Sequence, residues 1–187
     1  FPTRRSSDLI HLEGPFLSPE RIGAQSAQGT SPVDLDLMHR LYKACKGKLI
    51  NMTVAPELKG MRELALYCVE KGVILQAGHT NATYEQMLEG MQANIMHVTH
   101  LFNAMRPMHH REPGVVGAVL IHPEISCEII GDGVHVNPNL INLLIKSKPL
   151  SQIVLITDAL YPAKTDLSQS PDLYLDKCFY RKEDNVI

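Results

Sequence analysis

Short apolar runs alternate along the chain with stretches in which apolar residues recur every three or four positions. The apolar runs are typical of strands, and they cover residues 10–14, 48–56, 73–78, 94–100, 126–131 and 152–158. The periodic stretches predict helices over residues 31–47, 61–72, 81–92 and 137–147. Strands that alternate with helices of about a dozen residues indicate right-handed βαβ units and a parallel sheet buried on both faces. The predicted fold class is therefore α/β.

Capping residues set the expected ends of two of these helices. Ser31 is the expected N-cap of the first helix, Pro32 suits its first helical position, and Gly47 ends it. Asn137 and Pro138 open the last predicted helix in the same way. In the first helix the residues that form an apolar face are Leu37, Met38, Leu41 and Cys45.

Composition narrows the classes of partner. The 187 residues, 44% of them hydrophobic, suffice for one domain with a core. A net charge of -2 and a pI near 6.5 give no general attraction to nucleic acid or to an anionic membrane, and no apolar run approaches the roughly 20 residues that span a bilayer. The four scattered cysteines favour buried thiols over disulfides; they are Cys45, Cys68, Cys127 and Cys178. We therefore expect a cytoplasmic protein whose partner is a small molecule.

Both ends of the chain differ from its middle. Residues 1–9 form a polar, basic stretch without a start methionine and without the apolar segment of a secretory signal, and we interpret them as a non-native leader. After Leu150 the helical period disappears, and the last residues suggest strand segments that leave the main layer. The catalytic domain is expected to cover residues 10–165.

Titratable side chains stand at the carboxyl ends of five predicted strands. They are Glu13, His79, His100, His135 and Asp158. In a parallel sheet or α/β barrel the loops after these strand ends converge. We therefore expect the five side chains to lie in one site. A single His at a strand end is more often structural, and Glu13 or Asp158 alone could cap a helix, but coincidence at five strand ends favours a functional site. We interpret His97 as structural, and His39 and His122 as surface or loop residues.

A glutamate and two histidines make a good ligand set for a divalent ion such as zinc, with an open position for water. Such an ion lowers the pKa of its water and polarises a carbonyl, as amide hydrolysis requires. Asp158 could then take the proton of that water and return it to the leaving amine.

Five motifs together resemble the N-acetylglucosamine-6-phosphate deacetylase family of the amidohydrolase superfamily. They are HLEGPF, GHTNATYEQ, THLFNAMRPMHHREPGVVGAVL, DGVHVNP and LITDAL, and the resemblance runs from about Ile10 to Asp158. It implies a metal-dependent hydrolase with a (β/α)8 barrel and an accessory β-sandwich, which removes acetate from N-acetyl-D-glucosamine 6-phosphate. This chain would hold a partial TIM-type barrel that lacks the first two strands, and residues 166–187 would begin a return to the β-sandwich or a late barrel insertion.

The resemblance also implies roles for individual residues. Glu13, His79 and His100 would bind the metal, and Asp158 would be the catalytic acid and base. His135 would contact the substrate and help to polarise the acetyl carbonyl. Asn103 and the backbone N–H of Ala104 resemble the family's grip on the sugar phosphate. Arg111 resembles the arginine that reaches the phosphate in the neighbouring subunit, which implies a homodimer.

Two departures from the family pattern bear on these roles. Gln25 stands where many relatives have a histidine, so a substrate hydrogen bond from Gln25 is a weaker expectation. The H-x-H pair that supplies a second metal in some members is absent, along with the first two strands. The five or six strands present cannot close a barrel, so the expected activity belongs to the whole protein.

Several alternatives stay open from the sequence. The chain could belong to another amidohydrolase, such as a cyclic-amide hydrolase, or to a module that binds sugar phosphates without turnover. The ligand set accommodates zinc, iron, manganese or cobalt, one ion or two. The preferred N-acetylhexosamine phosphate is open, and His109 and His110 could brace a loop or line a dimer interface.

Overall fold

The sheet of this protein is a row of six parallel strands in chain order, seen in a computed structural model that describes residues 9–159, 172–175 and 178–181. The strands of the sheet are β1 (Ile10–Glu13), β2 (Leu49–Val54), β3 (Ile74–Ala77), β4 (His97–Val98), β5 (Ser126–Ile130) and β6 (Ile153–Ile156). Between them lie the helices α1 (Leu35–Ala44), α2 (Met61–Lys71), α3 (Tyr84–Gln92), α4 (Gly114–Ile121) and α5 (Pro138–Ser147). Short 3-10 helices occupy Ala27–Gly29 and Leu150–Gln152.

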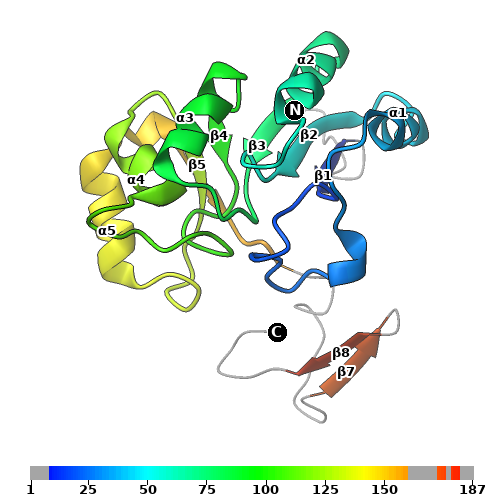
Figure 1. Cartoon of the computed structure of the whole chain (residues 1–187). Coiled ribbons are helices and arrows are strands. Elements are labelled where there is room, and N and C mark those ends of the chain that lie inside the picture. The colour runs from blue at the N-terminus through cyan, green and yellow to red at the C-terminus, as the bar shows by residue number, and fades with distance from the viewer. Residues whose placement is uncertain (1–8, 160–171, 176–177, 182–187) are drawn as a thin grey trace, which may run out of the picture.

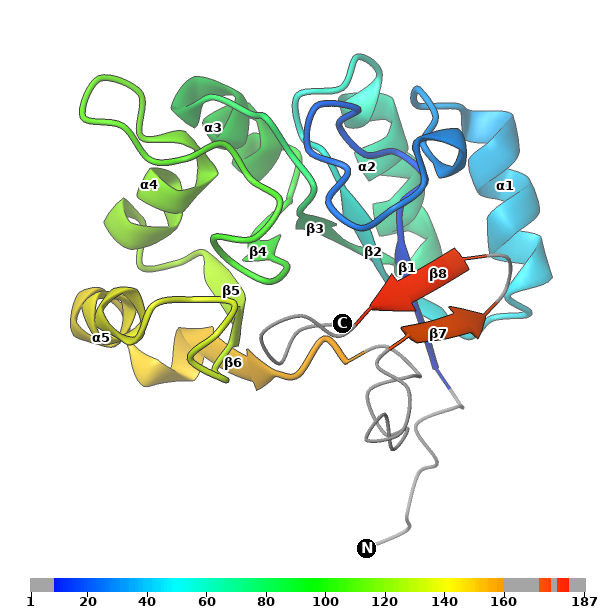
Figure 2. The same ribbon diagram turned by 90° about the horizontal axis from the view of Figure 1, so that it is seen from below.

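The sheet curls, and its helices lie along the outer, convex side (Figures 1 and 2). Each strand pairs in parallel with the next strand along the chain, from Ile10 opposite Leu49 at one edge to Ile130 opposite Ile156 at the other. This is the arrangement of consecutive βα units in a (β/α)8 barrel, of which six strands are present. The prediction of a partial barrel that does not close is confirmed.

The two sides of the sheet differ in polarity. Between the sheet and the helices lies an apolar core whose fully buried members include Met52, Val54, Leu64, Met87 and Val98. On the concave side, the buried Thr53 and Thr99 hydroxyls are 2.9 Å apart, and Thr99 donates to Gln76 Oε1 at 3.0 Å. Because buried polar groups need hydrogen-bond partners, this chain of hydrogen bonds fixes the positions of the three side chains on the concave side of the sheet.

Helix α4 was not predicted from the sequence. Its sequence GVVGAVLI carries no polar residue, and residues 114–119 are all buried. A helix that is apolar all round has no amphipathic period for a pattern to reveal. Side chains outside the helix form hydrogen bonds with backbone groups at its ends. Glu112 Oε1 accepts from Gly114 N, and the buried Lys148 Nζ donates to the carbonyls of Val119 and His122.

The predicted start of the first helix was wrong. Helix α1 begins at Leu35, and its N-cap is Asp34, whose Oδ1 accepts from the backbone N–H of Asp36 at 2.9 Å and of Leu37 at 3.0 Å. The Ser31 hydroxyl instead donates to the Pro32 carbonyl. At the last helix the prediction is confirmed, since Asn137 caps α5 with Pro138 in its first turn. The fourth predicted strand, residues 94–100, is reduced to β4, because the chain turns into the site loop at Thr99.

Replacing Asp34 with Ala is expected to lower the free energy of unfolding by about 1 kcal/mol, because two N–H groups at the start of α1 lose their acceptor. Ser31→Ala is the matched control and should change it by less than about 0.5 kcal/mol. Urea unfolding of the whole protein followed by circular dichroism measures both. Equal losses in the two variants would contradict the assignment of the cap.

The remaining described elements are the strands β7 (Asp172–Leu175) and β8 (Cys178–Arg181), which pair as an antiparallel hairpin. Strand character in this part of the chain agrees with the sequence. Its assignment to a β-sandwich or a barrel insertion stays a prediction, and residues 1–8 of the expected leader lie outside the described residues. No helix in the described ranges combines the length and apolarity that crossing a membrane requires.

Candidate metal centre and active site

Three predicted ligands meet at the carboxyl edge of the sheet. Glu13 is the last residue of β1, and His79 and His100 each follow the end of their strand by two positions, after β3 and β4. Glu13 Oε1 lies 3.0 Å from Nε2 of both histidines, and the two Nε2 atoms are 3.1 Å apart. One carboxylate and two imidazoles therefore aim their ligand atoms at one point, and they are the group of metal-ligand type found among the described residues.

The spacing and chemistry of this triad fit a divalent metal. Tetrahedral bonds of about 2.0–2.1 Å separate ligand atoms by about 3.3 Å, close to the distances observed. His79 Nδ1 donates to the Arg21 carbonyl at 3.1 Å, so in the neutral ring Nε2 carries a lone pair toward Glu13. A carboxylate oxygen and such lone pairs repel one another unless a proton or a cation lies among them. Zinc and similar ions accept this donor set.

Electrostatics keep the Glu13 carboxyl ionised, the form in which it can bind a cation. Burial alone would raise the pKa of the Glu13 carboxyl, but hydrogen bonds and charge from His100 and His79 outweigh it and hold that pKa far below its usual range. The His79 and His100 side chains are 7% and 3% exposed, whereas Glu13 is 29% exposed. The carboxylate therefore forms the open side of the centre, where a small molecule can approach. Within the described residues, His100 Nδ1 is buried without a hydrogen-bond partner.

Backbone strain concentrates at the predicted site. Of the seven described non-glycine residues with positive φ, four are predicted site residues: His79 at 44°, His100 at 32°, Ala104 at 49° and Asp158 at 49°. Left-handed backbone is costly for residues with a Cβ and persists where the surrounding structure enforces it. The positive φ angles of four predicted site residues therefore support a functional role for this end of the sheet.

Asp158 lines a cavity of 490 Å³ together with Glu13, one member of the triad. Its lining includes Glu13, Thr99, Glu128 and Asp158, and Asp158 follows β6 by two residues. Loss of hydration raises the pKa of the Asp158 carboxyl, the His100 ring opposes this, and the negative charge of Glu13 adds to it. A carboxyl with a raised pKa holds a proton more readily than an ordinary aspartate, which suits a group that takes up and releases a proton.

Gln25 occupies the other side of the Glu13 carboxylate. Its Nε2 donates to Glu13 Oε2 at 2.5 Å, while Glu13 Oε1 faces the histidines. The structure therefore gives Gln25 a contact with a predicted metal ligand, which the sequence did not suggest. The expected hydrogen bond from Gln25 to substrate stays a prediction.

His135 lies in the loop after β5 and is held by Asp132. Its Nδ1 is 2.6 Å from Asp132 Oδ2, and Asp132 Oδ1 accepts from the backbone N–H groups of Val134 and His135. These hydrogen bonds lower the pKa of Asp132 to about 2. The ionised carboxylate fixes the proton of His135 on Nδ1, so Nε2 can donate to a ligand only when the ring carries a second proton. Sequence reasoning missed Asp132.

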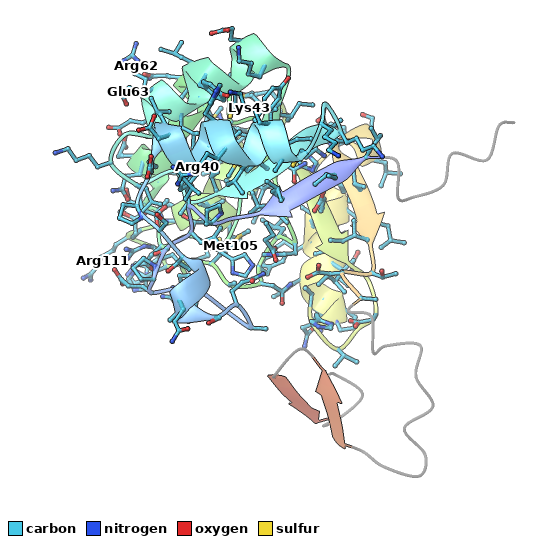
Figure 3. All side chains as sticks on the ribbon, turned by 90° about the vertical axis from the view of Figure 1, so that its right-hand side faces the viewer. Arg40, Lys43, Arg62, Glu63, Met105 and Arg111 are labelled. Carbon is cyan, nitrogen blue, oxygen red and sulfur yellow. The ribbon has the colours of Figure 1, made fainter. Side chains whose placement is uncertain are left out.

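The predicted phosphate grip follows His100 directly. The Asn103 amide donates to the His100 and Leu101 carbonyls at 3.4 Å, so its oxygen stays available. Ala104 accepts at its carbonyl from Thr80 N. Arg111 is exposed, at the periphery of the molecule (Figure 3). His109 accepts from Arg111 N and its ring lies 4.1 Å from that of His110, a contact that braces the loop.

The other histidines have structural partners. His97 Nδ1 lies 2.5 Å from Ser126 Oγ, in agreement with a structural role within β4. His122 and His39 each pair with a tyrosine hydroxyl, those of Tyr84 and Tyr67. Cys45, Cys68 and Cys127 are free and buried, as expected, and the side chain of Cys178 lies outside the described residues.

Comparison with known proteins shows that the chain matches one protein family and is similar to several solved structures. Residues 8–173 match the amidohydrolase family. N-acetylglucosamine-6-phosphate deacetylase of Bacillus subtilis strain 168 is 40% identical over 151 residues, which are 81% of this chain and 38% of that protein. The chain thus spans less than half the length of this relative.

Two solved structures show the same fold. A mutant of N-acetyl-D-glucosamine-6-phosphate deacetylase from Mycobacterium smegmatis, in complex with N-acetyl-D-glucosamine-6-phosphate, is 37% identical with a TM-score of 0.80, over 83% of this chain and 41% of that one. N-acetylglucosamine-6-phosphate deacetylase from Pasteurella multocida is 30% identical with a TM-score of 0.84, over 98% and 47%.

Proposed function

The chain belongs to the amidohydrolase family, and we propose that the whole protein is a metal-dependent deacetylase that acts on N-acetyl-D-glucosamine 6-phosphate. The observation that carries the proposal is the convergence of Glu13, His79 and His100 on one point, with Asp158 across the adjoining cavity. The names of the similar proteins support the substrate, since those proteins are N-acetylglucosamine-6-phosphate deacetylases and one is in complex with this sugar phosphate.

Glu13, His79 and His100 would hold the divalent ion, with zinc as the first candidate. When bound, such an ion lowers the pKa of a water and polarises the acetyl carbonyl. Asp158 would accept a proton from the attacking water and deliver it to the amine nitrogen as the C–N bond breaks. His135, held by Asp132, would contact the substrate and help to polarise the acetyl carbonyl.

The phosphate of the substrate is proposed to bind at the loop after His100. The Asn103 side chain and the Ala104 backbone N–H are the candidate donors in this subunit. Arg111 is proposed to reach the phosphate bound in a second copy of the chain, which makes the protein a homodimer. Its exposure at the periphery of the molecule supports a role across an interface. The free thiols of Cys45, Cys68 and Cys127 support a cytoplasmic location.

Acetate release by the purified whole protein tests the proposal. N-acetyl-D-glucosamine 6-phosphate should be deacetylated only with metal present, and removal by chelator followed by addition of zinc, iron, manganese or cobalt should restore turnover with at least one ion. Unphosphorylated N-acetyl-D-glucosamine should react with a much lower kcat/KM, and N-acetyl-D-galactosamine 6-phosphate measures the preference among hexosamines.

Two results would overturn the proposal. A metal-loaded protein that releases acetate from neither sugar would favour another amidohydrolase reaction or a binding role. Equal kcat/KM for the phosphorylated and unphosphorylated sugars would contradict the proposed phosphate-binding role of the loop after His100. Arg111→Ala should raise KM for the phosphorylated sugar and leave the slow reaction of the unphosphorylated sugar unchanged.

A further inference from the structure

The ring of His79 is held by a loop that is distant in the sequence. Arg21, in the segment between β1 and α1, directs its backbone carbonyl at His79 Nδ1, 3.1 Å away. The Cβ of an alanine at Gly23, two residues further on, would lie 3.2 Å from His79 Cε1, so the same segment also packs against the ring. The position of this loop therefore decides both the orientation of the imidazole and the nitrogen that carries its proton.

The loop is in turn tied to Asn81, two residues after His79. Arg21 Nε donates to Asn81 Oδ1 at 3.1 Å, and Asn81 Nδ2 donates to Glu20 Oε2 at 2.7 Å. The two ends of one amide thus bind two consecutive residues of the loop. Both contacts agree on which end of the amide is oxygen, because Arg can only donate and a carboxylate can only accept.

Asn81 has a fixed backbone from which it can exert this hold. Its N–H donates to Glu57 Oε1 at 2.7 Å, and its carbonyl accepts from Arg106 Nε at 2.8 Å. Glu57 lies in the loop after β2 and also accepts from the Thr80 hydroxyl at 2.5 Å. The backbone of Asn81 is therefore held by Glu57 and Arg106, while its side chain reaches the loop that carries Arg21.

These contacts close a ring of interactions around the metal ligand. The ring runs from the Asn81 side chain to the Arg21 guanidinium, through the Arg21 backbone to its carbonyl, to the His79 imidazole and back along the chain to Asn81. We propose that Asn81 is a positioning residue for the metal centre, which acts through Arg21 to hold His79 with its proton on Nδ1 and its Nε2 lone pair toward the metal. The inference rests on the metal-binding part of the proposed function.

Removal of outer partners of a metal-binding histidine lowers metal affinity by about 10–100-fold. Asn81→Leu keeps the size of the side chain and both backbone hydrogen bonds but removes the acceptor for Arg21. Its zinc affinity, measured by competition with a chromophoric chelator, should fall about 10-fold or more. Asn81→Asp combined with Glu20→Gln keeps an oxygen for Arg21 and exchanges the donor and acceptor of the contact with residue 20, so this variant should retain the affinity within about threefold.

A double-mutant cycle tests the route through Arg21. Arg21→Met should weaken zinc binding as Asn81→Leu does, and the double variant should be no weaker than either single variant, because both remove one link. Long-range 1H–15N correlation of the zinc-loaded protein reports the proton on His79 Nδ1 directly. Its signal should weaken or exchange faster in Asn81→Leu and stay as in the wild type in Asn81→Asp combined with Glu20→Gln. Asn139→Leu, at an exposed position on α5, is the matched control.

The outcomes separate this inference from the proposed function. Wild-type protein that binds no zinc would overturn the metal centre itself, before any variant is compared. If wild-type protein binds zinc and Asn81→Leu binds it equally well, or if the losses in the double variant are additive, Asn81 does not position His79. Circular dichroism of each metal-free variant shows whether it is folded, and if Asn81→Leu is not, Arg21→Met alone decides the matter by the same two readouts.

Discussion

Replacing Asp158 with Asn in the whole protein is expected to lower kcat for acetate release by about 10³-fold, within the range of 10²–10⁴ for general acid–base groups. The amide keeps the size of the side chain but cannot accept a proton from water or pass one to the leaving amine. The Glu13 carboxylate, which lines the same cavity, cannot take over the proton transfer, because it contacts His79, His100 and Gln25. Steady-state acetate release at saturating metal measures the loss.

Metal content is the control for this variant. Asp158 is not among the three converging ligand atoms, so Asp158→Asn should bind zinc as the wild type does. Asp36→Asn, at an exposed position in the first turn of α1, should leave both turnover and metal content unchanged. Turnover of Asp158→Asn within about tenfold of the wild type would assign the proton transfer to another group.

The pH profile gives a second readout of the same residue. As a base Asp158 must be ionised, so kcat/KM should fall as the pH drops through its pKa. Partial burial raises that pKa, and Glu13 adds to the shift while His100 and His79 oppose it, so the fall should begin at a higher pH than for an ordinary aspartate near 3.9. The residual activity of Asp158→Asn should lack this limb. Zinc affinity over the same pH range separates it from protonation of the ligands.

Much of the fold follows from local sequence rules. Alternating apolar runs and helical periods place five of the six strands and four of the five helices close to their observed positions, because a parallel sheet buried on both faces imposes these patterns. Helix α4 was not predicted, because its sequence GVVGAVLI is apolar on every side and shows no amphipathic period. The cap of α1 was misplaced because Ser31 and Asp34 are both good N-cap residues, and packing of the loop decides between them.

In the candidate site, too, some residues could be predicted from the sequence and others could not. Strand-end logic and motif resemblance select Glu13, His79 and His100, and the structure brings them within 3.1 Å of one another. The residues that orient these side chains could not be predicted from the sequence. A backbone carbonyl such as that of Arg21 has no residue type to recognise, and the link from Asn81 to Arg21 spans 60 positions. The positive φ angles at His79 and His100 are also imposed by tertiary contacts rather than by residue type.

The carboxylate of Glu13 is the only anion in the triad, and its loss is expected to empty the metal centre. Glu13→Gln keeps the shape of the side chain but replaces a charged ligand with a neutral amide, and it places an N–H₂ group opposite either Gln25 or the histidines. Zinc affinity should fall by more than about 100-fold, the upper end for outer partners of a ligand. Glu63→Ala, at an exposed position on α2 (Figure 3), is the matched control.

Thermal stability with and without zinc measures the loss of Glu13 independently of activity. A ligand at 1,000 times its Kd stabilises the native state by about 4 kcal/mol, so zinc should raise the unfolding temperature of the wild type and of Glu63→Ala clearly. At the same zinc concentration Glu13→Gln should show at most a small rise, with activity restored only by a large excess of metal. An undiminished zinc-induced rise in Glu13→Gln would mean that Glu13 is not a ligand, and that its position between His79 and His100 serves only to hold the two rings.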